Sequence, residues 1–142
     1  MPRSRRPAAV PRRSPCPVAG ALDLLGDKWT LLLVRDLFSG PKRYGDFAGA
    51  MEGIPTNLLA DRLKRLEAAG LVTRRAYQDN PPRHTYALTP AGAALRPVLQ
   101  ALVNWGRLHL PGTMVRAEVS GNPADSPFLP GWIKLPARRS SR

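Results

Sequence analysis

The sequence has almost no cysteine and very little histidine. Its 142 residues include one cysteine, Cys16, and two histidines, His84 and His109. A single cysteine cannot form a disulfide within one chain, and it excludes a metal site built on several cysteines. The two histidines are too few for a metal motif and are expected at surface or strand positions. The sequence therefore predicts neither a bound metal nor a cofactor.

The sequence also lacks a long apolar run and any familiar catalytic motif. No stretch approaches the roughly 20 apolar residues of a membrane span, and the basic N-terminus lacks the apolar segment of a secretory signal. There is no glycine-rich phosphate loop, and no base is paired with Cys16. These absences predict a cytoplasmic protein that is neither an enzyme nor bound to a membrane.

Acidic residues are missing from both ends of the chain, although the net charge of the whole is +12. Residues 1–15 contain five arginines, and residues 134–142 contain four basic residues. The stretch 16–133 has 13 basic residues and all ten acidic ones, so its net charge is only +3. Most of the charge therefore belongs to the tails, and charge alone does not identify a surface for nucleic acid.

Composition divides the chain into three parts. Residues 1–15 contain four prolines and no apolar periodicity, which predicts a disordered basic tail. Residues 111–142 are rich in glycine, proline and serine around one apolar patch at 128–135, and we expect a largely irregular extension. The remaining residues, 16–110, suffice for one domain with one core.

Apolar residues at helical spacing predict two helices at the start of this domain. The first covers about 18–25 and ends at Gly26, and Asp27 can cap the second by accepting hydrogen bonds from free N–H groups. The second is expected to stop at the run 39–41, because Pro41 cannot continue a helix. Its predicted apolar stripe consists of Trp29, Leu32, Leu33 and Leu37.

A short helix, a tight turn and a long helix are expected next. The short helix covers 45–51 with Phe47, Ala50 and Met51 facing inward, after a possible brief strand at 42–44. Gly53 suits a left-handed turn. The long helix covers 55–69, with either Pro55 in its first turn or Thr56 as its cap. Its predicted buried stripe is Leu59, Leu63 and Leu66.

Two extended runs, 71–77 and 83–89, then predict a β-hairpin with a five-residue tip at 78–82. A last amphipathic helix follows from Thr89 to about Leu110, and Pro97 either kinks it or marks its effective start. The expected fold class is therefore mainly α with a small antiparallel β-hairpin (α+β).

This order of elements is typical of a winged helix-turn-helix that binds duplex DNA. A short helix joined by a glycine turn to a longer one forms the helix-turn-helix, and the hairpin can lie beside the DNA backbone as a wing. Thr56 and Asn57 would lie at the end of the long helix that reads base edges. Basic side chains suited to phosphates are Lys42, Arg43, Lys64 and Arg65, with Asn80 at the wing's tip and Arg83 at its base. Asp61 lies on the same helix face and opposes this charge.

The chain resembles the HxlR-type regulators of bacteria, which are related to the MarR winged-helix proteins. The matching stretches are CPVAGALDLLGDKW (16–29), PKRYGDF (41–47), GIPTNLLADRLKRLEAAGLVTRR (53–75), Tyr77, PPRHTYALTPAG (81–92) and Trp105-Gly106. The resemblance implies a homodimer that binds a near-palindromic operator, as a repressor or an activator. It also implies contacts to the DNA groove from Pro55, Thr56, Asn57 and Arg62, and contacts from the wing and its flank through Asn80, Pro82, Arg83 and His84.

The same resemblance implies a dimer assembled through the first and last helices. Of the two roles, repressor and activator, we expect that of a repressor. A lone winged helix is small, and the last helix has an apolar stripe with little of its own domain left to cover it. The expected interface residues are Val18, Leu22, Val98, Leu102 and Trp105.

Cys16 has two interpretations. Some relatives sense oxidants or electrophiles through a cysteine near the start of the first helix, and Cys16 occupies that place. The helix start and the nearby arginines Arg12 and Arg13 form an electropositive setting, in which cysteines react most readily. The alternative is a small buried packing residue.

A different class of function also fits the pattern. A winged helix can serve as a module for protein or RNA contact, with only non-specific DNA affinity that comes from the arginine tails and falls steeply with salt. Deleting residues 1–15 separates the two possibilities, because a specific regulator keeps its preference among sites.

Overall fold

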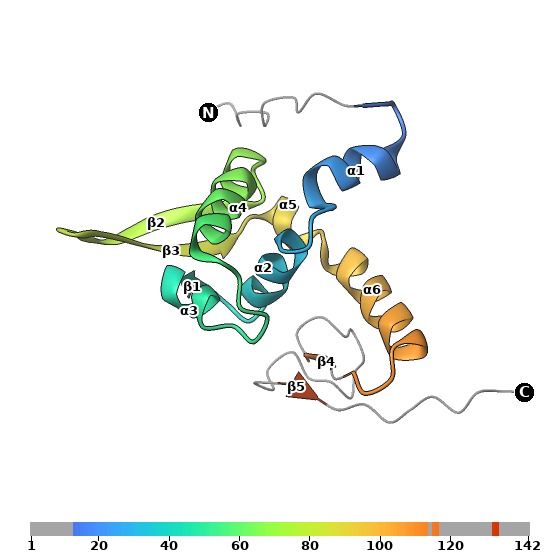
Figure 1. Ribbon diagram of the computed structural model, residues 1–142. Coiled ribbons are helices and arrows are strands. Elements are labelled where there is room, and N and C mark those ends of the chain that lie inside the picture. The colour runs from blue at the N-terminus through green and yellow to red at the C-terminus, as the bar shows by residue number, and fades with distance from the viewer. Residues whose placement is uncertain (1–12, 114, 117–131, 134–142) are drawn as a thin grey trace, which may run out of the picture. The chain divides into compact units, whose positions relative to one another are not determined.

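The computed structural model describes residues 13–113, 115–116 and 132–133, and the chain divides into two compact units, residues 1–92 and 93–142 (Figure 1). The described part of the first unit contains the helices α1 to α4 and a three-stranded sheet. The second contains the helix α6 and a pair of short strands. The short helix α5, Pro90–Ala93, spans the boundary between the units. Expectations for residues 1–12 lie outside the described residues.

Helices α1 (Pro17–Leu25) and α2 (Thr30–Leu37) are joined by a loop that Asp27 stabilises. One carboxylate oxygen of Asp27 accepts hydrogen bonds from the backbone N–H of Trp29 at 3.0 Å and of Thr30 at 3.2 Å. Asp27 therefore accepts from N–H groups at the start of α2 as expected, although the cap position itself is Trp29. The Asp27 carboxylate satisfies donors that have no partner within the first turn of α2.

The buried stripe of α2 differs from the expected one. Leu33, Val34 and Leu37 are buried, whereas Trp29 and Leu32 are only half-buried. The prediction placed Trp29 in the stripe, but this residue is the cap position and lies before the first helical turn. The inward face of α2 is therefore centred on Leu33, Val34 and Leu37.

Helix α3 is shorter than expected and covers only Tyr44–Ala48. Phe47 is buried as predicted, but Met51 is 77% exposed, so its predicted inward position is wrong. Gly49 follows the last helical residue, and glycine propagates a helix poorly. Gly53 has φ +65, the left-handed conformation expected for the turn.

Helix α4 covers Thr56–Ala68 and buries the three leucines of its predicted stripe: Leu59, Leu63 and Leu66. Pro55 occupies the cap position in an extended conformation, and Thr56 is the first helical residue. Both predicted starts are therefore wrong by one position, because Pro55 precedes the first turn and Thr56 is not the cap. Each buried leucine contributes about 1.5–3 kcal/mol relative to an exposed one. The C-terminal turn ends at Gly70, which has φ +75.

The sheet has three antiparallel strands in the order β1-β3-β2: β1 (Lys42–Arg43), β2 (Val72–Asp79) and β3 (Pro82–Leu88). The hairpin register runs from Val72 opposite Leu88 to Asp79 opposite Pro82, with an irregularity between Ala76 and Gln78. The wing is therefore longer than predicted, and its tip is two residues instead of five. Strand pairing needs only backbone groups, so it continues through polar residues that carry no alternating pattern.

Thr89 locks the two ends of this hairpin together. Its backbone N–H donates to the carbonyl of Leu71 at 3.1 Å, and its hydroxyl donates to the carbonyl of Gly70 at 2.6 Å. The same hydroxyl accepts from the N–H of Gly92 at 3.1 Å, at the start of α5. One side chain thus joins the end of α4, the base of the wing and the start of the next helix.

In the second unit, α6 covers Arg96–His109, with Pro97 in its first turn. The second predicted role of Pro97, marking the helix start, is therefore confirmed. Strand β4 (Val115–Arg116) pairs with β5 (Trp132–Ile133) in antiparallel fashion. The rest of the apolar patch at 128–135 and most of the expected irregular extension lie outside the described residues.

Within the described residues, no helix is both long enough and apolar enough to cross a membrane.

Candidate nucleic-acid interface

The outer face of α4 is exposed along its whole length. Its exposed residues are Thr56, Asn57, Ala60, Asp61, Lys64, Arg65, Glu67 and Ala68. The helix has 13 residues, and at 1.5 Å per residue it is about 20 Å long. Its diameter suits the major groove of DNA. The leucine stripe on the opposite face fixes which residues point outward.

The amino end of α4 combines a fixed backbone with unengaged side chains. The Tyr44 hydroxyl of α3 donates to the carbonyl of Thr56 at 2.7 Å and connects the two helices of the helix-turn-helix. Within the described residues, the side chains of Thr56 and Asn57 make no hydrogen bond. Pro55, Thr56 and Asn57 are all exposed. This is the arrangement that a base-reading end of a helix requires.

Arg62 is placed differently from the groove position that the resemblance implies. Its Nε donates to the Asp27 carboxylate at 2.8 Å, and its guanidinium also pairs with Asp61. These partners raise the pKa of Arg62, with the Asp27 hydrogen bond as the main cause. Arg62 thereby joins α4 to the loop before α2, and it offsets the negative charge of Asp61.

The environment of Asp27 favours its ionised form. Partial burial raises the pKa of Asp27, but hydrogen bonds from Thr30, Arg62 and the Trp29 backbone outweigh that effect and lower it to about 2. The carboxylate is therefore charged at neutral pH and holds both the start of α2 and the middle of α4.

A second ion-pair network lies behind the turn, and it was not predicted from the sequence. Arg35 of α2 is only 9% exposed. Its guanidinium donates to Asp36 at 3.0 Å and to the two carboxylate oxygens of Glu52, one of them at 3.1 Å. Burial lowers the pKa of Arg35, but the two carboxylates outweigh this and raise it. Because Glu52 precedes Gly53, the pair fixes the turn that aims α4.

Basic side chains surround the exposed face of α4. Lys64 and Arg65 are both exposed, and Arg65 also approaches the carbonyl of Asp23 at 3.5 Å. In β1, Lys42 is half-buried opposite Tyr86, and Arg43 is exposed. Part of the positive charge expected for phosphates thus flanks the helix-turn-helix.

The wing places Asn80 at its tip, beside Pro82. Arg83 lies opposite Gln78, near the tip, so its predicted position at the base of the wing is wrong. The reason is the greater length of the strands. His84 lies one residue further in, opposite Ala76, and is half-buried.

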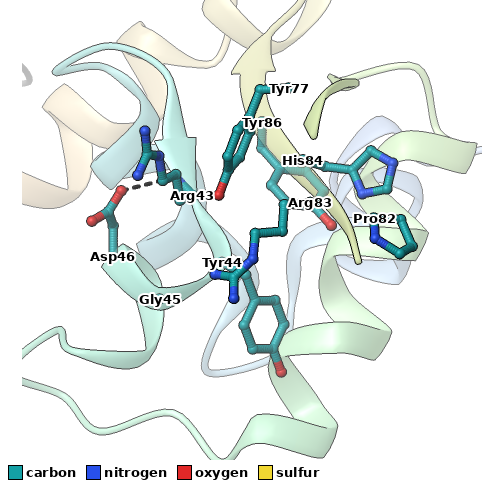
Figure 2. Close-up of a pocket in the computed structure, with 9 residues that line it drawn as sticks. All are labelled: Arg43, Tyr44, Gly45, Asp46, Tyr77, Pro82, Arg83, His84 and Tyr86. Carbon is teal, nitrogen blue, oxygen red and sulfur yellow. Dashed lines mark hydrogen bonds between the residues drawn. The ribbon is translucent and has the colours of Figure 1, made fainter. Parts of the chain in front are cut away.

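A pocket of about 520 Å³ lies where β1 and α3 meet the wing (Figure 2). It is lined by Arg43, Tyr44, Gly45, Asp46, Tyr77, Pro82, Arg83, His84 and Tyr86. The guanidinium of Arg43 lies 4.6 Å from the centre of the Tyr77 ring, and its backbone N–H donates to Asp46 at 2.8 Å. Four of the expected DNA-contacting residues line this pocket, Arg43, Pro82, Arg83 and His84, so the pocket adjoins the candidate interface.

The residues expected at a dimer interface are exposed in the single chain. On α1, Val18 and Leu22 are 65% and 54% exposed. On α6, Val98, Leu102 and Trp105 are 41%, 52% and 59% exposed, and the Trp105 ring contacts His109 with 4.8 Å between centroids. Each helix therefore presents apolar side chains to solvent in one chain.

Cys16 is exposed at the cap position of α1, so the alternative of a buried packing residue is wrong. The expected electropositive setting is also reduced, because Arg13 forms an ion pair with Asp23 of α1. Arg12 lies outside the described residues. Among the described residues, no group of three or more cysteine, histidine or acidic side chains is arranged to hold a metal ion.

A helix-turn-helix made of α3 and α4, followed by the β2–β3 hairpin as a wing, defines a winged helix-turn-helix protein. The model of the family described as HxlR-like helix-turn-helix matches residues 24–114. The chain belongs to this family of transcriptional regulators, as the resemblance suggested.

Relatives and solved structures agree with this assignment. An HTH-type transcriptional regulator of Synechocystis is 41% identical over 91 residues, which are 64% of this chain and 67% of that protein. One from Mycobacterium tuberculosis is 43% identical over 94 residues, which are 66% of this chain but only 59% of that protein. The chain thus spans about three fifths to two thirds of these curated relatives.

Among solved structures, the oxidised form of the redox regulator HypR is similar at 36% identity with a TM-score of 0.59, over 64% of this chain and 94% of HypR. The reduced form of the regulator YodB of Bacillus subtilis matches at 33% identity with a TM-score of 0.58, over 69% of this chain and 97% of YodB. YodB has also been solved with a quinone bound.

Proposed function

We propose that this protein is a repressor that binds duplex DNA as a homodimer at a near-palindromic operator, in the cytoplasm with the nucleoid. The observation that carries the proposal is the amino end of α4. There, Thr56 and Asn57 are exposed and unengaged on a backbone that Tyr44 and the Arg35–Glu52 pair hold in place. Fixed side chains of this kind can discriminate among base pairs.

The two groups of contacts have different tasks. Asn57 can pair with adenine through two hydrogen bonds, and Thr56 can use its hydroxyl or its methyl. Pro55 lies against the same groove edge. Lys64, Arg65, Lys42 and Arg43 neutralise phosphates, and Asn80, Pro82, Arg83 and His84 contact the backbone beside the groove. Arg62 acts indirectly, because it is engaged by Asp27 and positions α4.

Two copies of the chain would present two copies of α4. The exposed apolar residues of α1 and α6 supply surfaces for a second chain, which support a dimer through Val18, Leu22, Val98, Leu102 and Trp105. A two-fold dimer reads an inverted repeat, so the operator is near-palindromic. Sedimentation that finds only monomers at micromolar concentration would contradict this part.

We also propose that Cys16 makes the repressor responsive to oxidants or electrophiles. The thiol is exposed. Of two structural neighbours, HypR is described as a redox regulator and YodB has been solved with a quinone bound. With one cysteine per chain, an oxidant yields an intersubunit disulfide, a mixed disulfide or an oxidised acid of the thiol, and an electrophile such as a quinone yields a covalent adduct. If operator release by diamide or a quinone is unchanged in Cys16→Ser, the sensor proposal is wrong.

The DNA proposal is tested by selecting genomic fragments that the full chain binds, followed by affinity measurements on the selected site. Asn57→Ala is expected to reduce discrimination against mismatched sites by about tenfold, whereas Lys64→Ala weakens all sites alike. The two residues lie on the same exposed face, which makes them a matched pair. Equal losses for all sites in both variants would mean that α4 does not read bases.

Removing residues 1–15 provides a second test. A specific repressor keeps its preference among sites, although its overall affinity falls. Loss of nearly all binding, with no preference left, would favour a module for protein or RNA contact whose arginine tail alone attracts DNA.

A further inference from the structure

The pocket beneath the wing contains an unusual combination of side chains. Three tyrosines line it, from α3, β2 and β3, and the only apolar aliphatic residue in the lining is Pro82. A pocket of about 520 Å³ is within the range that small-molecule sites occupy. Aromatic rings without aliphatic neighbours favour a flat ring as ligand over a flexible chain.

The charge of the pocket is also informative. Arg43 stacks on Tyr77, and Asp46 accepts from the Arg43 backbone. Within the described residues, Arg83 has neither an ion pair nor a hydrogen bond through its side chain. Figure 2 shows the Arg83 side chain extending from β3 toward Tyr44, while the His84 ring points the other way. Arg83 therefore brings a positive charge with free donors to the pocket.

We propose that this pocket binds a small aromatic anion. The ring of the ligand lies against Tyr44, Tyr77 and Tyr86, and its carboxylate or similar group accepts hydrogen bonds from Arg83. Arginine is suited to this task, because its planar guanidinium can donate two parallel hydrogen bonds to a carboxylate.

Two contacts connect the pocket to DNA binding, and this consequence rests on the proposed function. Arg83 is expected to face the DNA backbone, so a ligand that occupies its guanidinium removes one wing contact. Tyr44 lines the pocket and also bonds the carbonyl of Thr56 at the start of α4. A bound aromatic anion is therefore expected to weaken operator binding.

Binding is tested by calorimetric titration of the full chain, without DNA, with sodium benzoate as the probe. Benzyl alcohol provides the ring without the charge, cyclohexanecarboxylate the charge without the aromatic ring, and inorganic phosphate a small anion alone. Benzoate is expected to bind at least about fivefold more tightly than the other three. No binding at about 10 mM, where even millimolar affinity is measurable, would overturn the proposal.

Variants assign the binding to this pocket. Arg83→Gln is expected to weaken benzoate binding about tenfold, which is the loss of one charge-assisted contact of about 1.4 kcal/mol. Tyr77→Leu is expected to weaken it severalfold. The matched control is Arg75→Gln, since Arg75 is an exposed arginine of β2 that does not line the pocket. An equal loss in this control would contradict the assignment, because it would indicate general charge attraction.

The control ligands also test the proposal. If phosphate binds as tightly as benzoate, the pocket is a site for a small anion, such as a DNA phosphate, and the aromatic assignment is overturned. Benzyl alcohol that binds equally well excludes the role of Arg83. Benzoate binding to a protein that selects no DNA sequence would leave the pocket established and the proposed function refuted.

Discussion

Helix α4 and the wing are the two elements proposed to contact DNA, but they are held very differently. The helix buries three leucines and is tied from behind by the Arg35–Glu52 and Arg62–Asp27 pairs. In the wing, every residue of β2 after Val72 is exposed. Under the proposed function, the comparison favours a division of labour: a rigid helix that would read bases, and a wing whose outer part is held mainly by its own backbone hydrogen bonds and could adjust to the DNA backbone.

The largest effect is expected from the core beneath α4. Leu63→Ala should lower the free energy of unfolding by about 2–5 kcal/mol, because it leaves a cavity under the helix. Urea denaturation followed by circular dichroism measures this. A loss under 1 kcal/mol would mean that α4 is held much less by its leucines than its burial indicates.

A smaller effect is expected from the ion pair behind the turn. Glu52→Gln removes one of the two negative charges beside Arg35 and should cost about 1–3 kcal/mol, because it weakens charged hydrogen bonds at a partly buried site. The matched control is Glu67→Gln, since Glu67 forms an exposed, long pair with Arg74 at 3.7 Å. The control should change stability by less than about 0.5 kcal/mol. Equal effects would show that the Arg35 pair does not support the turn.

Asp27 should make the anchoring of α4 sensitive to acid. Its pKa is lowered from 3.8 to about 2 in the folded chain. A lowered pKa means that the stabilisation is complete above about pH 4 and is lost as pH falls toward 2. Asp27→Asn should therefore reduce stability by about 1 kcal/mol at pH 7, since solvent screens this site. The difference between variant and parent should shrink in acid. Stability curves of equal separation at pH 7 and pH 2.5 would contradict it.

The smallest effect on stability is expected in the wing itself. Gln78→Ala should change the free energy of unfolding by less than about 0.5 kcal/mol, because the side chain is exposed. In the parent protein, the backbone amides of 76–84 should exchange with deuterium much faster than those of the middle of α4. Equal protection in both elements would remove the contrast between a rigid helix and an adaptable arm.

The sequence predicted the rigid element better than the adaptable one. The leucine stripe of α4 and the Gly53 turn follow from spacing and from glycine's access to positive φ, both of which are local properties. The position of the tip of the wing cannot be predicted in this way, because backbone pairing imposes no pattern on exposed polar residues such as Gln78 and Asp79.

The charged contacts behind α4 were the main omission. Arg35 and Asp36 lie in an apolar helix, where charged residues are ordinarily expected to face solvent. Only the fold reveals that Glu52, 17 residues away, approaches Arg35. Likewise, the family resemblance implied a DNA contact for Arg62, whereas its side chain pairs with Asp27, 35 residues away. Such long-range pairs cannot be derived from local periodicity.

Thr89 affects how freely the length of the wing can change during evolution. Its bonds to Gly70 and Leu71 bring the two ends of the hairpin to one point, so the chain leaves and re-enters the core at the same place. Residues added or removed in opposing pairs beyond that point would alter the reach of the arm without displacing α4. The reach of the wing and the base preference of the helix can therefore diversify independently within one architecture.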